Sequence, residues 1–364
     1  MPEIIKSHSR FDVFEVKFAK HREYTINVDA GGDLSLHTVL EDGLKAMNAV
    51  PLSRFVLGGC QHYPAYVDKW GAQVSPLTWI QGDACEAGEM LSTQVTALNG
   101  LDVNPIEFGG RVVGTCYEDD YARYVRVSGL LPSDPTAARD EQTRSLFENL
   151  RAVLAQQGMR FTDTVRTWLY LDELLNWYDS FNAVRTRFFE AEGVFDAMVP
   201  ASTGIGAANP EGAAIIADLL AVHPKSEDVK IFPVASPLQG SAMEYRSSFS
   251  RAVEVALPTH RSLYVSGTAS IDREGRSVHL GDAEKQIDLT MAVIHEILTS
   301  RGMDWDDVSR GIAYFKNHED VALFKAYCLK QGIERFPLSI SHADVCRDDL
   351  LFELEVDAVT LQGV

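Results

Sequence analysis

The chain has 364 residues, of which 46% are hydrophobic and 23% charged, values typical of a globular protein of two or three domains. Its net charge of −19 argues against a nucleic-acid or anionic-membrane partner, and no apolar run is long enough to predict a membrane span. Since no apolar signal region is visible at the start and the five scattered cysteines form no CxxC pair, we expect the chain to work in the cytoplasm.

Residues 1–118 carry the weakest signals, and we predict only an α/β region there. FDVFEVKF and EYTINVDA alternate as strands do, and LHTVLEDGLKAM predicts a helix. Cys60 and His62 could be two ligands of a metal, but no second pair accompanies them, so we expect no metal site. RFVLGG, residues 54–59, faintly echoes a strand found twice later in the chain. Residues 1–118 could therefore be a degenerate copy of the unit that is repeated later.

From about Ala122 the chain repeats itself. ARYVRVSGLL is echoed by HRSLYVSGTA at an offset of 138 residues. A helix and strand segment follows in both copies, at an offset of 144. The segment PASTGIGAANPEGAAIIADLLAV, from Pro200, is echoed by PLSISHADVCRDDLLFELEVDAV, from Pro337, at an offset of 137. Repetition on this scale indicates that one supersecondary unit has been duplicated.

Each copy shows the same order of predicted elements. A strand leads to an amphipathic helix, which ends at Gly158 in one copy and Gly302 in the other, as expected of left-handed C-caps. A strand, a second helix, a Pro-containing loop and a last strand follow. This pattern predicts an α+β unit with helices on one sheet face. We place the first repeat at residues 119–223, a polar connector at 224–240 and the second repeat at 241–364.

The last strand of the second repeat alternates apolar and acidic residues over positions 351–357. Such alternation predicts one core face and one polar face, and the polar face would carry Glu353, Glu355 and Asp357. The loop before it contains Cys346. Two interpretations stay open from the pattern alone: a solvated acidic edge, or an acid/base site.

The repeats resemble the RidA (YjgF-like) unit over roughly residues 120–222 and 258–360. Longer strings, among them VRTWLYLDELLNWYDSFNAVRTRFF, SPLQGSAMEYRSSFSRA and CRDDLLFELEVDA, resemble the chorismatase family, whose members carry RidA-like domains. The resemblance implies tandem RidA-like units with helices packed on mixed β-sheets, around a pseudo-trimeric, barrel-like core. It also implies an enzyme that releases pyruvate from chorismate without metal or organic cofactor, as a monomer or a small homo-oligomer.

The same resemblance places the catalytic acid on Glu353. Laying Pro200 on Pro337 puts Ile216 opposite Glu353, so that only the second copy carries the acid. Cys346 stands seven residues before this glutamate, as in family members that make hydroxybenzoate, and a thiolate there could assist the reaction. The alternative for Cys346 is a small buried hydrophobe.

Chorismate has two carboxylates, which call for arginines with bidentate geometry. Arg251 is the first candidate, and Arg166 with its repeat partner Arg310 is the second; for each the alternative is an ion pair within the protein. Further candidates for substrate binding are Tyr245, Ser202, Thr203 and Gly267. The Ser and Thr hydroxyls could instead bond their own backbone.

The function that the resemblance implies is conversion of chorismate into 3-hydroxybenzoate and pyruvate. Hydrolysis to 3,4-dihydroxycyclohexa-1,5-diene carboxylate, or a mixture of 3- and 4-hydroxybenzoate, is the first alternative. A non-catalytic RidA-like ligand-binding protein and an imine deaminase are the others. Deamination is disfavoured because Ala201 and Leu338 follow the loop prolines, where RidA deaminases have an arginine.

Overall fold

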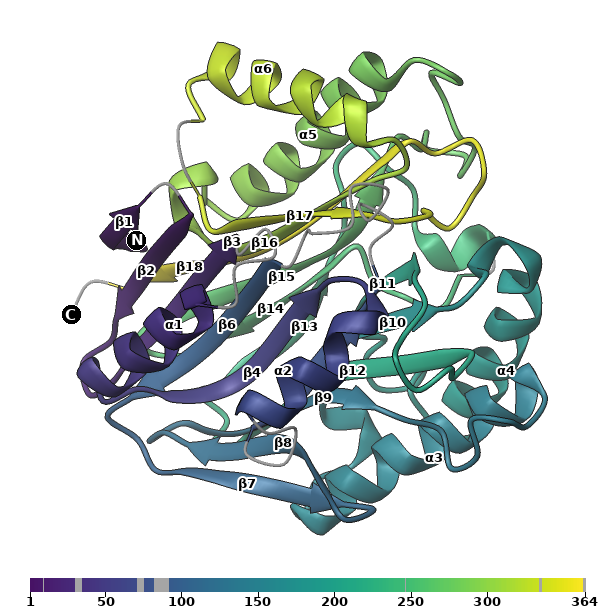
Figure 1. The fold of residues 1–364 in the computed structure, drawn as a ribbon. Coiled ribbons are helices and arrows are strands. Elements are labelled where there is room, and N and C mark those ends of the chain that lie inside the picture. The colour runs from purple at the N-terminus through teal and green to yellow at the C-terminus, as the bar shows by residue number, and fades with distance from the viewer. Residues whose placement is uncertain are drawn as a thin grey trace.

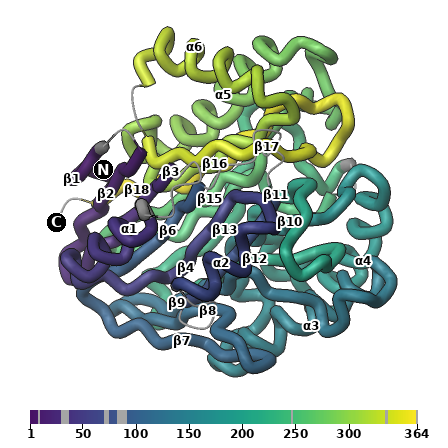
Figure 2. The backbone as a smooth tube through the Cα atoms, in the orientation of Figure 1, coloured from purple at the N-terminus to yellow at the C-terminus, as the bar shows by residue number. Residues whose placement is uncertain are grey.

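The structure is a computed structural model that describes residues 1–8, 10–29, 35–70, 75–81, 92–245, 247–333 and 336–362. Within these ranges the strands form three six-stranded sheets, each built from one continuous stretch of the chain (Figure 1). The tube in Figure 2 shows the three stretches side by side, in purple to blue, blue to teal, and green to yellow.

The first unit contains β1 (Glu3–His8), β2 (Phe11–Lys17), β3 (Arg22–Asp29), α1 (Ser35–Ala46), β4 (Val50–Leu57), α2 (Tyr63–Trp70), β5 (Leu77–Ile80) and β6 (Ser92–Asn99). The second contains β7 (Val103–Phe108), β8 (Arg111–Glu118), β9 (Ala122–Leu130), α3 (Arg139–Gln156), β10 (Thr164–Leu171), α4 (Tyr178–Ala191), β11 (Ala201–Gly206) and β12 (Ile215–Pro224). The third contains β13 (Lys230–Val234), β14 (Ala252–Ala256), β15 (His260–Ala269), α5 (Ala283–Ser300), β16 (Val308–Phe315), α6 (Val321–Gln331), β17 (Leu338–His342) and β18 (Phe352–Leu361).

Short 3-10 helices are η1 (Cys60–His62), η3 (Phe161–Asp163), η4 (Leu174–Asn176), η5 (Ala242–Tyr245), η6 (Trp305–Asp307) and η7 (His318–Asp320). No helix in the described part of the chain is long and apolar enough to cross a membrane.

All three sheets have the same topology. Their strand orders are β1-β2-β3-β6-β4-β5, β7-β8-β9-β12-β10-β11 and β13-β14-β15-β18-β16-β17. In each sheet one pair is parallel, namely β4 with β5, β10 with β11 and β16 with β17, and a helix connects the two strands of that pair. The fold class predicted from the sequence, tandem α+β units on mixed sheets, is therefore confirmed.

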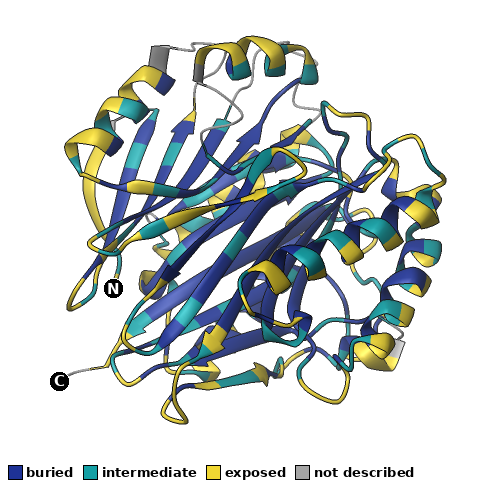
Figure 3. Ribbon diagram, turned by 90° about the horizontal axis from the view of Figure 1, so that it is seen from below, coloured by how far each residue is buried: buried dark blue, intermediate teal, exposed yellow. Residues whose placement is uncertain are grey.

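Helices cover the outer face of each sheet, and the inner faces meet in a shared core (Figures 1 and 3). Three of the hydrophobic clusters each join one sheet to its own helices. A fourth cluster lies between the sheets and takes residues from all three, including Phe55, Trp168, Tyr170, Ile312 and Tyr314. Burial of this inner cluster holds the units together.

Local sequence explains the long helices. In α3 the side chains of Leu146, Leu150 and Val153 recur at helical spacing and are buried against the second sheet. Gly158 and Gly302 follow the ends of α3 and α5 with φ of 69° and 67°, the left-handed conformation expected for them.

The sheets also suggest where the units begin and end. β7 and β8 pair with β9, and β13 pairs with β14, so that residues 103–118 belong to the second sheet and residues 230–234 to the third. We propose that the unit limits follow the sheets, near residue 101 and near residue 227.

β18 lies in the middle of the third sheet, between β15 and β16. Its acidic face is buried: the exposed fractions of Glu353, Glu355 and Asp357 are 4%, 0% and 5%. The interpretation of this face as a solvated edge is wrong, because the other two units cover it.

Gly129 lies where a strand of the second sheet passes close to β5 of the first sheet. It has φ of 57°, and a Cβ at this position would lie 2.2 Å from the carbonyl oxygen of Leu77 in β5. We expect Gly129→Ala to lower the free energy of unfolding by about 1–2 kcal/mol for the left-handed conformation and by about 1–3 kcal/mol more for the overlap.

Urea unfolding measures this loss. Gly193→Ala is the matched control, because Gly193 has φ of 70° but no heavy atom within 4 Å of an added Cβ. Equal losses for the two variants would contradict the close approach of the two sheets.

Candidate functional site

A cavity of about 1320 Å³ lies between the second and third units. One wall comes from the end of η4 and from α4 of the second unit, and includes Tyr178, Asn182 and Thr186. The other wall comes from the third unit, with Glu353 and the residues Met243, Ser247, Ser248, Phe249, Arg251, Gly267, Ala269, Ile271, Cys346, Arg347 and Asp348. The cavity therefore needs both units.

Glu353, the second residue of β18, lines this cavity. Its backbone neighbours are Ala269 on β15 and Tyr314 on β16, both in regular strands, so its position is fixed by the sheet. Burial, and after it the charge of Glu355, raises the pKa of Glu353 from 4.5 to about 8, while Arg166 and Arg251 act against this rise. Glu353 therefore holds its proton at neutral pH.

Gly267 makes room for that carboxyl group. A Cβ at Gly267 would lie 2.0 Å from Glu353 Oε1 and 3.1 Å from the methyl group of Thr203. The Gly267 N–H donates a hydrogen bond of 2.9 Å to Thr203 Oγ1, which ties β15 of the third unit to β11 of the second. Of the sequence candidates, Gly267 thus acts by its lack of a side chain.

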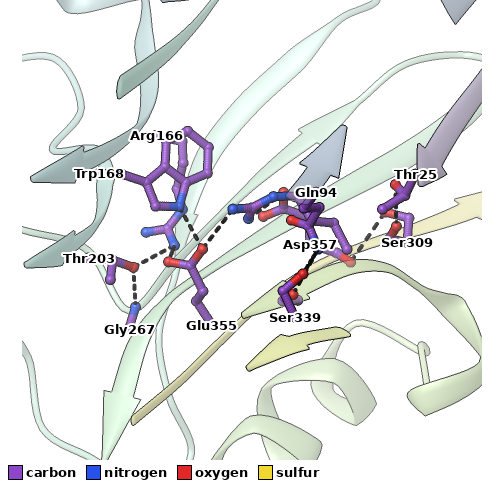
Figure 4. Close-up of polar contacts among 12 residues, drawn as sticks. Thr25, Gln94, Arg166, Trp168, Thr203, Gly267, Ser309, Ser339, Glu355 and Asp357 are labelled. Atoms are coloured by element: carbon purple, nitrogen blue, oxygen red, sulfur yellow. Dashed lines mark hydrogen bonds and ion pairs between the residues drawn. The ribbon is translucent and has the colours of Figure 1, made fainter. Parts of the chain in front are cut away.

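Glu355, two residues further along β18, is the centre of a buried ionic network (Figure 4). It accepts hydrogen bonds from Arg166 at 2.9 Å, from the indole Nε1 of Trp168 at 2.8 Å and from Arg310 at 2.9 Å. Arg310 also pairs with Asp357 at 3.4 Å. Two guanidinium groups and an indole N–H thus satisfy the oxygens of this fully buried carboxyl group.

Arg166 and Arg310 therefore form ion pairs within the protein, which was the alternative to substrate binding for both residues. Neither lines the cavity. Arg166 NH2 also donates a hydrogen bond of 2.7 Å to Thr203 Oγ1, so that the Thr203 hydroxyl is used inside the protein. Ser202 is buried as well, with its Oγ accepting a hydrogen bond from Thr167 and its N–H donating to Ser266.

Arg251 and Cys346 do lie in the cavity wall with Glu353. Arg251 Nε donates to the carbonyl of Gly240 at 3.0 Å, and the guanidinium lies 5.5 Å from the ring centre of Phe249. Burial, followed by the proximity of Glu353, raises the pKa of the Cys346 thiol to about 12. The resting group is thus the neutral thiol rather than the thiolate considered from the sequence.

The structure assigns no role at the cavity to three further residues that the sequence singled out, Tyr245, Cys60 and His62. Tyr245 ends η5 near the cavity, but its side chain lies outside the described part of the structure. Cys60 and His62 stand in η1, and no group of three or more potential metal ligands was found among the described residues.

Sequence reasoning missed the contribution of α4. Tyr178 and Asn182 are one turn apart on this helix and both face the cavity. Burial raises the pKa of Tyr178 well above its ordinary range, and Cys346 and Glu353 add to that rise, so the hydroxyl stays a hydrogen-bond donor beside the acid. The sequence signal that could have indicated this wall is the pair of polar residues Tyr178 and Asn182, spaced four residues apart in a predicted helix.

Comparison with known proteins finds relatives named for chorismate chemistry. A chorismatase of Streptomyces rapamycinicus is 26% identical over 216 residues, which span 54% of this chain and 64% of that protein. A 3-hydroxybenzoate synthase of Streptomyces hygroscopicus is 25% identical over 269 residues, 66% of this chain and 75% of that protein. A chorismatase crystal structure matches 94% of this chain and 100% of its own chain, with a TM-score of 0.66 and 20% identity.

The family model described as Endoribonuclease L-PSP matches twice, over residues 119–215 and 239–359. The two matches fall on the two repeats, and the resemblance to RidA-like units and to chorismatases stated from the sequence is confirmed. Since the matches cover more than half of its length, the chain belongs to the Endoribonuclease L-PSP family.

Proposed function

We propose that this protein is a chorismatase that converts chorismate into 3-hydroxybenzoate and pyruvate. The observation that carries the proposal is Glu353, a carboxyl group that keeps its proton at neutral pH in the wall of a cavity large enough to admit chorismate. The names of the chorismatase and 3-hydroxybenzoate synthase relatives support the same substrate. The proposed reaction uses side chains of the protein and no cofactor.

Chorismate is a dianion, and the net charge of −19 repels it at long range. Local cations must therefore hold it. Arg251 lies in the wall beside Glu353 and is near enough to act on its pKa, which suits a guanidinium that binds one substrate carboxylate next to the reacting group.

The first step is transfer of the Glu353 proton to the methylene carbon of the enolpyruvyl group. The C=C electron pair forms the new C–H bond, and the ether carbon becomes an oxocarbenium centre. The departing proton leaves Glu353 as a carboxylate. The pKa of about 8 suits this task. Glu353 is mostly protonated at neutral pH, and its proton is held weakly enough to be donated.

The second step decides the product. If the ring hydroxyl attacks the ring carbon that carries the ether oxygen, the ring C–O bond breaks, its electron pair leaves with pyruvate, and the hydroxyl proton passes to the Glu353 carboxylate. The epoxide-like intermediate then opens by taking up that proton and loses a ring proton as it aromatises to 3-hydroxybenzoate. If water attacks the oxocarbenium centre, pyruvate and the non-aromatic diol result. The first route consumes no water, whereas the second requires a water molecule at the oxocarbenium centre.

Replacing the acid tests the proposal. We expect Glu353→Gln to lower pyruvate release from chorismate by about 10²–10⁴-fold, because the amide cannot donate the proton. Circular dichroism should show an intact fold. Glu319→Gln, an exposed change in η7 far from the cavity, is the control. A Glu353→Gln variant that retains pyruvate release within threefold of the parent would refute the acid role of Glu353. A parent that binds chorismate but releases no pyruvate would favour a binding protein.

The pH dependence follows from the same carboxyl group. Its pKa is raised in the folded state, so the stability it contributes is complete below its ordinary value of 4.5 and is lost as pH rises through about 8. We expect Glu353→Gln to gain in stability relative to the parent between about pH 5 and about pH 9, measured by urea unfolding. kcat/KM of the parent should fall above about pH 8. A stability difference independent of pH would show that Glu353 has an ordinary pKa.

Product analysis tests the role of Cys346. The parent should release 3-hydroxybenzoate and pyruvate in equal amounts. We expect Cys346→Ala to keep pyruvate release within about tenfold but to divert product to the non-aromatic diol, because the thiol no longer assists opening of the intermediate. Only diol from the parent would contradict 3-hydroxybenzoate synthesis, and an unchanged product ratio in the variant would remove Cys346 from the mechanism. Ammonia release from amino-acid imines would instead indicate a deaminase.

A further inference from the structure

Arg185 is a buried cation on α4, one turn beyond Asn182. Its exposed fraction is 2%. Its NH2 group donates a hydrogen bond of 2.6 Å to Asn182 Oδ1, and the guanidinium lies 5.1 Å from the ring centre of Phe181. Asn182 lies one turn beyond Tyr178 on the same helix. Arg185 thus stands behind two residues that line the cavity.

No described carboxylate forms an ion pair with Arg185, and its Nε has no hydrogen-bond partner among the described residues. The buried arginines Arg54, Arg166 and Arg310 differ, because each of them pairs with a glutamate. A buried guanidinium with no counter-ion is unfavourable in a folded protein. Its retention at this place requires an explanation other than stability.

The surroundings of Arg185 indicate what would compensate its charge. The groups that act on its pKa from nearby are the hydroxyl of Tyr178 and the thiol of Cys346, and both line the cavity that holds Glu353. An anionic group seated between Tyr178 and Cys346 would therefore lie next to the guanidinium. A carboxylate fits this position best, since Arg185 and the Tyr178 hydroxyl are both donors.

We propose that Arg185, which is not itself a lining residue but lies directly behind Asn182, binds a substrate carboxylate as the counterpart of Arg251, and that this carboxylate, seated against Asn182 and Tyr178, supplies its missing counter-ion. This inference rests on the proposed function for the identity of the substrate. In the ligand-free protein the uncompensated charge of Arg185 lowers the free energy of unfolding. The carboxylate of a bound substrate neutralises that charge.

A comparison of two arginine variants tests the inference without any substrate. Arg185→Met removes a cation that has no counter-ion, so its melting temperature should equal or exceed that of the parent. Arg54→Met is the matched control, because Arg54 is also buried, at 7% exposure, but is paired with Glu41. Its loss leaves a carboxylate unpaired, and the melting temperature should fall by several degrees. A comparable fall for Arg185→Met would overturn the proposal in favour of a structural arginine.

Ligand binding gives the second readout. Benzoate and pyruvate, used separately at millimolar concentration, represent the two ends of a chorismate-like dicarboxylate. At least one should raise the melting temperature of the parent, and Arg185→Met should lose that shift while Arg185→Lys keeps part of it. A full shift in Arg185→Met, or no shift in the parent with either anion, counts against the site.

Chorismate kinetics separate this inference from the proposed function. If the parent releases pyruvate, Arg185→Met should raise KM at least tenfold, with a smaller effect on kcat, and Arg185→Lys should recover part of the loss. An unchanged KM would overturn the assignment. If the parent leaves chorismate intact, the proposed function fails, whereas the anion shift of the parent and its loss in Arg185→Met still support a carboxylate site at Arg185.

Discussion

The carboxylate of Glu355 is the contact on which the junction of the second and third units depends. It belongs to β18, yet two of its three hydrogen-bond donors, Arg166 and Trp168, come from β10 of the neighbouring sheet. Removing any partner would leave a charge or an indole N–H buried without compensation, at a cost of about 3–5 kcal/mol for a broken ion pair. The relative position of the two units, and so the shape of the cavity between them, is set by this network.

The same network gives Glu353 and Glu355, two glutamates on one strand, different electrostatic surroundings. Glu355 forms ion pairs with two guanidinium groups, whereas Glu353 faces the cavity, forms no ion pair with any described residue, and has a raised pKa. A fixed negative charge two residues away makes loss of the Glu353 proton harder. Two carboxyl groups on one strand thus have different surroundings because of where the units place their arginines, and only Glu353 faces the cavity.

Much of this could be predicted from the sequence, because the duplication singled out Glu353 against Ile216 and the alternation assigned its strand. The partners of Arg166 could not be predicted, since they depend on how two separately folded sheets dock, and no local pattern encodes that docking. Burial of the acidic face of β18 could not be predicted for the same reason, because it also results from the docking of the units. The first unit shares the topology of the others, but its sequence retains little of the repeat, so only its existence could be suspected.

The strand registers reveal three corresponding positions, one in each unit: Gln94 lies opposite Phe55, Asp218 opposite Trp168 and Glu355 opposite Ile312. Three identical chains would repeat any residue at this position three times around a common axis, together with its desolvation cost. In one continuous chain the three junctions are chemically independent. A single substitution changes one of them, so one junction can hold a reactive group while the other two serve only cohesion.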